Sequence, residues 1–270
     1  MSRRTSFYIA FDAMFLALFI IFSFAPNIGY ITFGPISFTT IHILVLIGAL
    51  LFGKWQGLLF GTYMGILSLL VSLQYPGTVN YLFLNPFVSV LPRMLFGFLA
   101  GLIFDIFRKK STFAGFLMIS APLCGILTLL HTVLTLSFLY VFGYLDIFYI
   151  SQAMGFREII EANNNAFGSF GNFIAAFIAP GSVCEIAGAI VLSPAIMGVL
   201  YKAVIKKNEN SFGINVHFLP ENSEGALSKK QLIIITVILG AIVVLLAGVV
   251  LFLYYYFKWA IIYFLYNFVI

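Results

Sequence analysis

The sequence predicts an all-α, polytopic membrane protein, and three observations support that prediction. Hydrophobic residues make up 62% and charged residues 9% of the chain, against about 45–50% and about 25% in soluble domains. Several apolar runs exceed the roughly 18 residues that a membrane-spanning helix requires. The runs are continuous, whereas the strands of a membrane β-barrel are short and alternate between apolar and polar residues. Lipid is therefore the expected solvent for most of the surface.

The apolar runs divide the chain into one domain and an appendage. Residues 1–205 hold six expected helices, which we place at residues 6–25, 38–52, 55–73, 87–107, 113–142 and 172–201. Residues 206–230 form a polar cytoplasmic linker, and residues 231–270 hold an additional helix, 231–257, with a tail too short to cross a membrane again. The first run resembles a signal peptide, but further spans follow it, so we interpret it as a retained helix.

Basic residues set the expected orientation of the helices. Eleven of the fourteen Lys and Arg residues fall on one side of the six-helix arrangement. Such residues collect on cytoplasmic loops, so the N-terminus is expected in the cytoplasm. The connections 26–38, 74–86 and 143–170 are then expected on the outer side of the membrane.

Arg93 lies inside the fourth expected span and Glu185 lies near the middle of the sixth. A charge at that depth is costly unless it is paired or hydrated, so it indicates a functional site. Arg93 is suited to hold a carboxylate through two hydrogen bonds. Glu185 is suited to accept hydrogen bonds from a ligand or to carry a proton. The alternative for both is an ion pair with each other.

Further polar side chains are expected to meet on the outer side. The candidates for contact with a small polar ligand are Thr40, His42, Tyr81, Asn85 and Asn172, with His131 in the fifth helix as a weaker one. Taken singly, each has an ordinary explanation as a helix cap, a core histidine or a turn residue. Their convergence at one end of the bundle favours a binding pocket. No spacing typical of a metal site links the histidines, and no metal is expected.

Small residues recur at helical spacing in three of the expected helices. The third helix carries Gly57, Gly61 and Gly65, and the fourth carries Gly97 and Gly101. Residues of this size allow two helices to approach closely, and we interpret these glycines as internal packing positions. The first helix carries Ala13 and Ala17 in the same pattern, and for this pair a surface between proteins is an equally good interpretation.

At this point the chain resembles a known family. The alanines around Ala13 and Ala17, the stretch GPISFTTIHILVLIGALLFGKWQGLLFG at residues 34–61 and the stretch NPFVSVLPRMLFGFLAG at residues 85–101 carry the likeness. They are similar to the substrate-binding S component of energy-coupling factor (ECF) vitamin transporters, of the pantothenate/pyridoxamine-type branch. The likeness covers about residues 6–205, and the linker and seventh helix depart from the family pattern.

The resemblance implies a six-helix bundle in a bacterial cell membrane with a vitamin pocket roofed by the outer loops. It implies that Ala13 and Ala17 dock onto a transmembrane coupling subunit, and that Arg93 faces the pocket. ATP would be used by two partner ATPase subunits, and no cofactor is expected in this chain.

The leading expectation is high-affinity binding and translocation of a small water-soluble vitamin. Pantothenate comes first because an inward arginine suits its carboxylate, and pyridoxamine or pyridoxine comes second with Glu185 meeting the amine. The alternative is a self-sufficient proton-coupled secondary transporter, which would be expected to show inverted repeats with broken helices. We find no convincing repeat, and no catalytic set that would indicate an enzyme.

Overall fold

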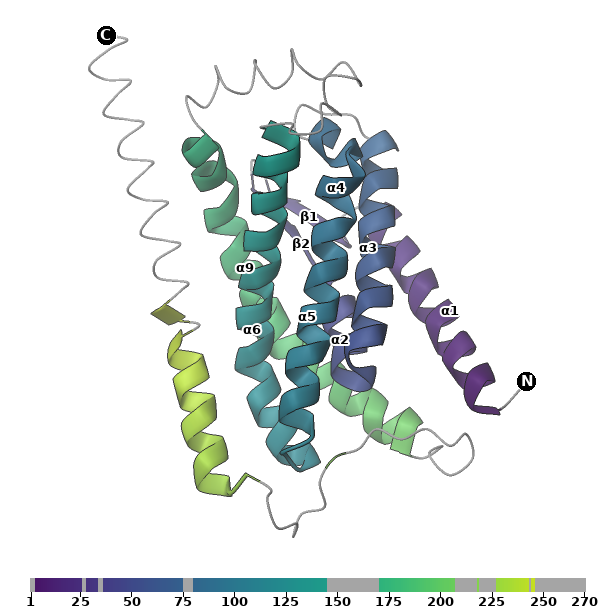
Figure 1. Cartoon of the computed structure of the whole chain (residues 1–270), viewed down its shortest axis with the longest axis vertical. Coiled ribbons are helices and arrows are strands. Elements are labelled where there is room, and N and C mark those ends of the chain that lie inside the picture. The colour runs from purple at the N-terminus through teal and green to yellow at the C-terminus, as the bar shows by residue number, and fades with distance from the viewer. Residues whose placement is uncertain are drawn as a thin grey trace.

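Helix α2 (Ile41–Phe52) lies at the centre of a helix bundle (Figure 1). The structure of the chain, a computed structural model, describes residues 3–25, 28–33, 36–74, 80–144, 170–206, 218, 227–242 and 244–245. The α2 sequence IHILVLIGALLF is apolar on every side, which is the pattern of a helix surrounded by protein. In agreement, the side chains from Ile41 to Leu51 are all buried.

The other elements surround α2 or cover one of its ends. The helices are α1 (Arg3–Phe24), α3 (Lys54–Gln74), α4 (Pro86–Ser89), α5 (Leu91–Arg108), α6 (Phe113–Phe138) and α9 (Phe170–Leu200). A short 3₁₀ helix, Asn80–Leu84, precedes α4, and π-helical turns follow α6 at Leu139–Tyr144 and α9 at Tyr201–Ile205. The strands are β1 (Tyr30–Phe33) and β2 (Ile36–Thr39).

Five of these helical stretches are long and apolar enough to cross a membrane within the described part of the chain. They are Thr5–Phe24, Lys54–Gln74, Pro86–Arg108, Phe113–Phe138 and Ser182–Ile205. The chain is thus a multi-pass, all-α membrane protein, as the composition predicts. Helix α2 has 12 residues, which span about 18 Å at 1.5 Å per residue against a hydrocarbon core of about 30 Å.

A β-hairpin occupies the space beyond the start of α2. Strands β1 and β2 pair antiparallel, with Tyr30 opposite Thr39 and Phe33 opposite Ile36. The sequence predicted that the second helix begins at residue 38 and that residues 26–38 form a loop. The helix instead begins at Ile41, because Phe38 and Thr39 belong to strand β2. In Figure 1 the hairpin lies behind α5 and α6, at the end of the bundle away from the N-terminus.

The helix predicted at residues 87–107 is divided at Val90 into α4 and α5. Pro92 has no backbone N–H, so the carbonyl of Val88, four residues earlier, loses its helical partner. The chain turns at this point, and the two parts together still form one apolar stretch long enough for a span.

Glycines allow α3 and α5 to pack backbone against backbone. A Cβ atom built on Gly57 would lie 2.1 Å from the carbonyl oxygen of Gly97, and one on Gly61 would lie 2.2 Å from that of Arg93. Any side chain would force the helices apart. The interpretation of these glycines as internal packing positions is confirmed.

Helix α1 packs on the bundle through a ridge of phenylalanines. Phe11, Phe15 and Phe19 are buried, and the rings of Phe15 and Phe60 stack with their centroids 4.9 Å apart. The sequence analysis overlooked Asp12 in this helix, whose carboxylate accepts a hydrogen bond from the Gln56 side chain of α3. That bond supplies a partner for a charged group inside a span.

The turn between α2 and α3 is fixed by two charged residues at the end of α5. Gly53 has a φ of 80°, a conformation that favours glycine. Arg108 donates to the carbonyl of Leu51 at 2.8 Å and pairs with Asp105. Arg108 thus bonds a carbonyl at the end of α2, and Asp105 accepts from the Lys54 backbone N–H at the start of α3. These backbone groups have no partner within their own helices.

The C-terminal segment packs on the opposite end of the bundle from the hairpin. Residues 229–242 are helical, and in Figure 1 they lie beside α6. Leu232 fills the space over Gly115, where an added Cβ would lie 2.7 Å from the leucine side chain. The Phe218 ring lies 5.1 Å from that of Tyr201. The predicted boundaries of the linker and the seventh helix remain predictions, since most of residues 206–270 lie outside the described part.

Gly61→Ala is expected to lower the thermal unfolding temperature, because its Cβ has no space beside the Arg93 carbonyl. Overpacking of this kind costs about 1–3 kcal/mol. Gly188→Ala is the matched control, since its nearest neighbour would be Ile43 Cδ1 at 3.9 Å. Scanning fluorimetry of the purified variants in detergent measures both. Equal unfolding temperatures for Gly61→Ala and the wild type would contradict the tight α3–α5 contact.

Candidate functional site

Arg93 lies at the joint between α4 and α5 and is 6% exposed. Its Nη1 donates to the carbonyl oxygens of Ser89 at 2.7 Å and Val88 at 3.0 Å. The guanidinium thus replaces the hydrogen bond that Pro92 removes from the Val88 carbonyl. The Phe83 ring covers it, with the centroid 5.2 Å from Cζ.

Part of the Arg93 hydrogen-bonding capacity is left unused. Its Nε is buried without a hydrogen-bond partner among the described residues. No ion pair joins Arg93 to Glu185 in that part of the chain, where the structure pairs Arg108 with Asp105. The mutual pairing that the sequence left open is therefore not formed.

Two histidines stack beside Arg93 in the centre of the bundle. The rings of His42 in α2 and His131 in α6 are 5.9 Å apart between centroids and nearly parallel, at 12°. His42 is 0% exposed and His131 is 6% exposed. Both ring nitrogens of His42, and Nδ1 of His131, have no hydrogen-bond partner among the described residues. Backbone groups of Thr39 and Glu185 nevertheless lie close enough to the His42 ring to interact with it, so the interpretation of His42 as a core histidine stays open.

We refer to Arg93, His42 and His131 as the central cluster. His131 lies within electrostatic range of both His42 and Arg93, and the Phe96 ring packs 4.8 Å from His131. Three helices thus bring hydrogen-bonding groups into one apolar surrounding. Each unpartnered buried group of this kind costs about 1–3 kcal/mol, so the cluster is unfavourable for stability alone.

The side chains of Glu185 and Thr40 bind the hairpin, although the backbone of Glu185 lies close to His42 of the central cluster. Oε1 of Glu185 accepts hydrogen bonds from the Thr39 backbone N–H at 2.6 Å and from Thr39 Oγ1 at 3.0 Å. Oγ1 of Thr40 donates to the carbonyl of Ile28 at 2.7 Å and so closes the base of the hairpin. The contacts of Glu185 and Thr40 in this structure are therefore within the protein.

Tyr30 is a residue of the site that the sequence analysis missed. It stands opposite Thr39 in the hairpin, and its phenol lies beside Ser68 and within electrostatic range of Arg93. Burial raises the pKa of the phenol above its ordinary value, although the charge of Arg93 acts in the opposite direction. The only sequence signal was a tyrosine in an aromatic-rich loop, which does not predict a direction for the side chain.

Asn85 has a structural role in the contacts that it makes. Its side-chain oxygen accepts from the Phe87 N–H at 3.0 Å and caps α4, while Nδ2 donates to the Phe142 carbonyl at 3.1 Å. The side chains of the other two predicted contacts, Tyr81 and Asn172, lie outside the described part of the structure.

The surface alanines of α1 point away from the bundle. Ala13 and Ala17 are exposed, and they lie on the side of the helix away from the buried ridge of Phe11, Phe15 and Phe19. Helix α1 therefore exposes these two small residues to its surroundings, on a side that also carries the exposed Ile9 and Ile20.

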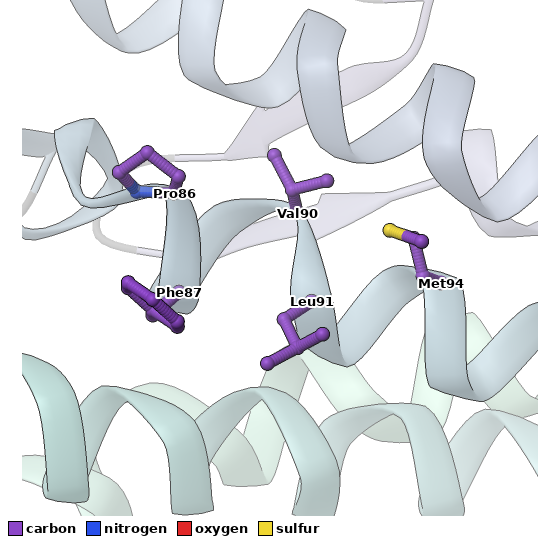
Figure 2. Close-up of a pocket in the computed structure, with 5 residues that line it drawn as sticks. All are labelled: Pro86, Phe87, Val90, Leu91 and Met94. Atoms are coloured by element: carbon purple, nitrogen blue, oxygen red, sulfur yellow. The ribbon is translucent and has the colours of Figure 1, made fainter.

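A shallow pocket of about 200 Å³ lies elsewhere, on the outer face of α4 and α5 (Figure 2). Its lining is apolar and consists of Pro86, Phe87, Val90, Leu91 and Met94. None of the polar candidates lines it. Within the described residues, no group of three or more His, Cys, Asp or Glu side chains is placed to hold a metal ion.

Comparison with known proteins agrees with this architecture. The model of the family described as "ECF transporter, substrate-specific component" matches residues 7–200. The chain belongs to this family. It is a transport protein and not an enzyme, and the resemblance read from the alanines of α1 and the two longer stretches is confirmed.

One curated relative shares most of its length with this S component. A protein named "Pantothenate transporter PanT", from Leuconostoc mesenteroides, is 28% identical over 205 residues. The match covers 74% of this chain and 95% of the relative. The family match ends at residue 200, so the C-terminal segment that packs on Gly115 lies beyond the matched part.

Asn85→Ala is expected to destabilise the protein by about 1–2 kcal/mol, since it removes the α4 cap and the bond to the Phe142 carbonyl. Asn85→Ser keeps a capping oxygen and should lose less. Thermal unfolding in detergent compares the two. If the two variants unfold at the wild-type temperature, the structural role of this amide is wrong.

Proposed function

We propose that this chain is the vitamin-binding subunit of an ATP-driven ECF importer and that its substrate is pantothenate. The observation that carries the proposal is the central cluster, with buried polar atoms on three side chains that lack protein partners among the described residues. Such groups are favourable when a ligand satisfies them. The name of the relative from Leuconostoc mesenteroides supports the choice of vitamin.

The chemistry of the central cluster suits pantothenate, which carries a carboxylate, an amide and two hydroxyl groups. Arg93 would hold the carboxylate through a charge-assisted hydrogen bond. The two imidazoles each supply one donor and one acceptor when neutral, which matches hydroxyl and amide groups. Tyr81 and Asn172 remain predicted contacts.

The partners proposed for this subunit are a transmembrane coupling subunit and two ATPase subunits that use the ATP. Ala13 and Ala17 would form the docking face, because they are exposed and small. With the N-terminus in the cytoplasm, as the basic residues predict, the hairpin end of the bundle would face outward and receive the vitamin.

His42→Phe is expected to weaken pantothenate binding about tenfold or more, because it removes two ring nitrogens from the cluster. It should leave the thermal unfolding temperature unchanged or raise it, since neither nitrogen has a hydrogen-bond partner at bonding distance among the described residues. Calorimetric titration of the purified chain in a mild detergent, with pyridoxine and pyridoxamine as comparison ligands, measures the affinity. His42→Gln is the polar control and should lose less affinity.

Two results would contradict the proposed substrate. One is wild-type protein that binds a B6 vitamer and not pantothenate, and the other is unchanged pantothenate affinity in a folded His42→Phe variant. Proton-coupled uptake by the isolated chain in liposomes would favour the secondary-transporter alternative.

Ala13→Trp is expected to abolish co-purification with the coupling subunit and to leave pantothenate affinity within about twofold, because the residue lies away from the cluster. Ala195→Trp is the matched control, since Ala195 is an exposed alanine on α9. Affinity purification of the tagged chain from its host membrane measures assembly. Normal assembly of the Ala13→Trp protein would exclude this face as the docking site.

A further inference from the structure

Among the described residues, one facing pair in the hairpin contacts helices on both sides of it. Tyr30 and Thr39 face each other across the two strands. On one side Thr39 is bound to Glu185 of α9 through two hydrogen bonds. On the other side Tyr30 lies beside Ser68 of α3 and near Arg93 of α5. The hairpin therefore bridges helices that lie on different sides of α2.

The bond to Glu185 has the features of a strong but reversible contact. A single carboxylate oxygen accepts both donors of Thr39, at 2.6 and 3.0 Å. Hydrogen bonds to a carboxylate are about twice as strong as those between neutral groups, and a low local dielectric strengthens them further. Breaking the contact requires movement of one hairpin residue relative to α9 and no unfolding of a helix.

The contact is directly connected to the central cluster. Thr39 precedes His42 by three residues, and the intervening Thr40 closes the hairpin base through Ile28. His42, His131 and Arg93 are at most 6% exposed while the contact is formed. A polar ligand reaches these buried groups only after some part of the protein moves, and the hairpin lies beside them, with Tyr30 near Arg93 and Thr39 near His42.

We propose that the Thr39–Glu185 contact is a latch that holds the hairpin closed over the central cluster, and that Glu185 is a positioning residue rather than a ligand contact. This inference rests on the proposed function, since it treats the central cluster as the substrate site. The latch sets the rates at which the vitamin enters and leaves. Arg93 and the histidines set the equilibrium affinity.

The chemistry of Glu185 separates this role from a direct or proton-carrying one. Glu185→Gln keeps the Oε1 atom that accepts both hydrogen bonds and removes the charge. If Glu185 acts as a latch, its contact with Thr39 is therefore weakened in this variant but still forms. If Glu185 binds an amine or transfers a proton, that function is lost in this variant. Glu185→Ala removes the acceptor, and Thr39→Val removes the hydroxyl donor while it preserves the side-chain shape.

The test is the kinetics of pantothenate binding to the full chain in detergent, measured by surface plasmon resonance. Glu185→Ala is expected to raise both the association and dissociation rates about tenfold, with a smaller change in Kd. Thr39→Val should show a weaker effect of the same kind, and Glu185→Gln the smallest. Because both variants act on one contact, the Glu185→Ala/Thr39→Val double variant should match Glu185→Ala alone.

A ligand-free measurement makes the latch testable by itself. Hydrogen exchange at the backbone amides of residues 28–42 should be about tenfold faster in Glu185→Ala than in the wild type, and close to the wild-type rate in Glu185→Gln. Unchanged exchange and unchanged binding rates in Glu185→Ala would overturn the latch. Loss of affinity in Glu185→Gln equal to that in Glu185→Ala would overturn it in favour of a ligand contact. Wild-type protein that binds no pantothenate but shows the exchange pattern would refute the proposed substrate and leave the latch standing.

Discussion

The shortness of α2 is the constraint on which the rest of this structure depends. Twelve residues cover about 18 Å, so the helix fills only part of the membrane thickness. Beyond its start the chain forms the β-hairpin, whose two strands pair with each other. The hairpin and α2 together fill the centre of the bundle, with a junction between them at Thr39 and Thr40. The polar groups of the site gather beside this junction.

Polar side chains inside the bundle divide into two kinds. Arg108, Asp105 and Asn85 have protein partners that compensate helix ends, and Asp12 has Gln56. The central cluster differs because some of its buried atoms have no such partner among the described residues. Arg93 belongs to both kinds. Its Nη1 donates to two backbone carbonyls at the joint between α4 and α5, while its Nε has no hydrogen-bond partner among the described residues. This contrast separates structural polar groups from those proposed to bind substrate.

Helix α1 has one surface that packs on the bundle and another that is proposed for assembly. Its phenylalanine ridge is buried against α3, while Ala13 and Ala17 remain exposed. At the other end of the chain, Leu232 packs over Gly115 although this segment lies beyond the family match. The addition to the family fold is therefore in contact with the bundle. It meets α6 at the end opposite the hairpin, away from the central cluster.

The sequence by itself determined the membrane class, the family and the approximate helices, because apolar composition, run length and small-residue spacing are local properties. It also determined that Arg93, His42 and Glu185 are unusual, since polar groups in apolar helices are visible without a structure. Only the tertiary structure decided their partners. Arg93 meets two carbonyls because Pro92 frees one of them, and Glu185 meets Thr39 from 146 residues away in the sequence. The hairpin and the stacking of His42 on His131 were likewise beyond prediction, because long-range pairing depends on how the helices pack and not on any local pattern.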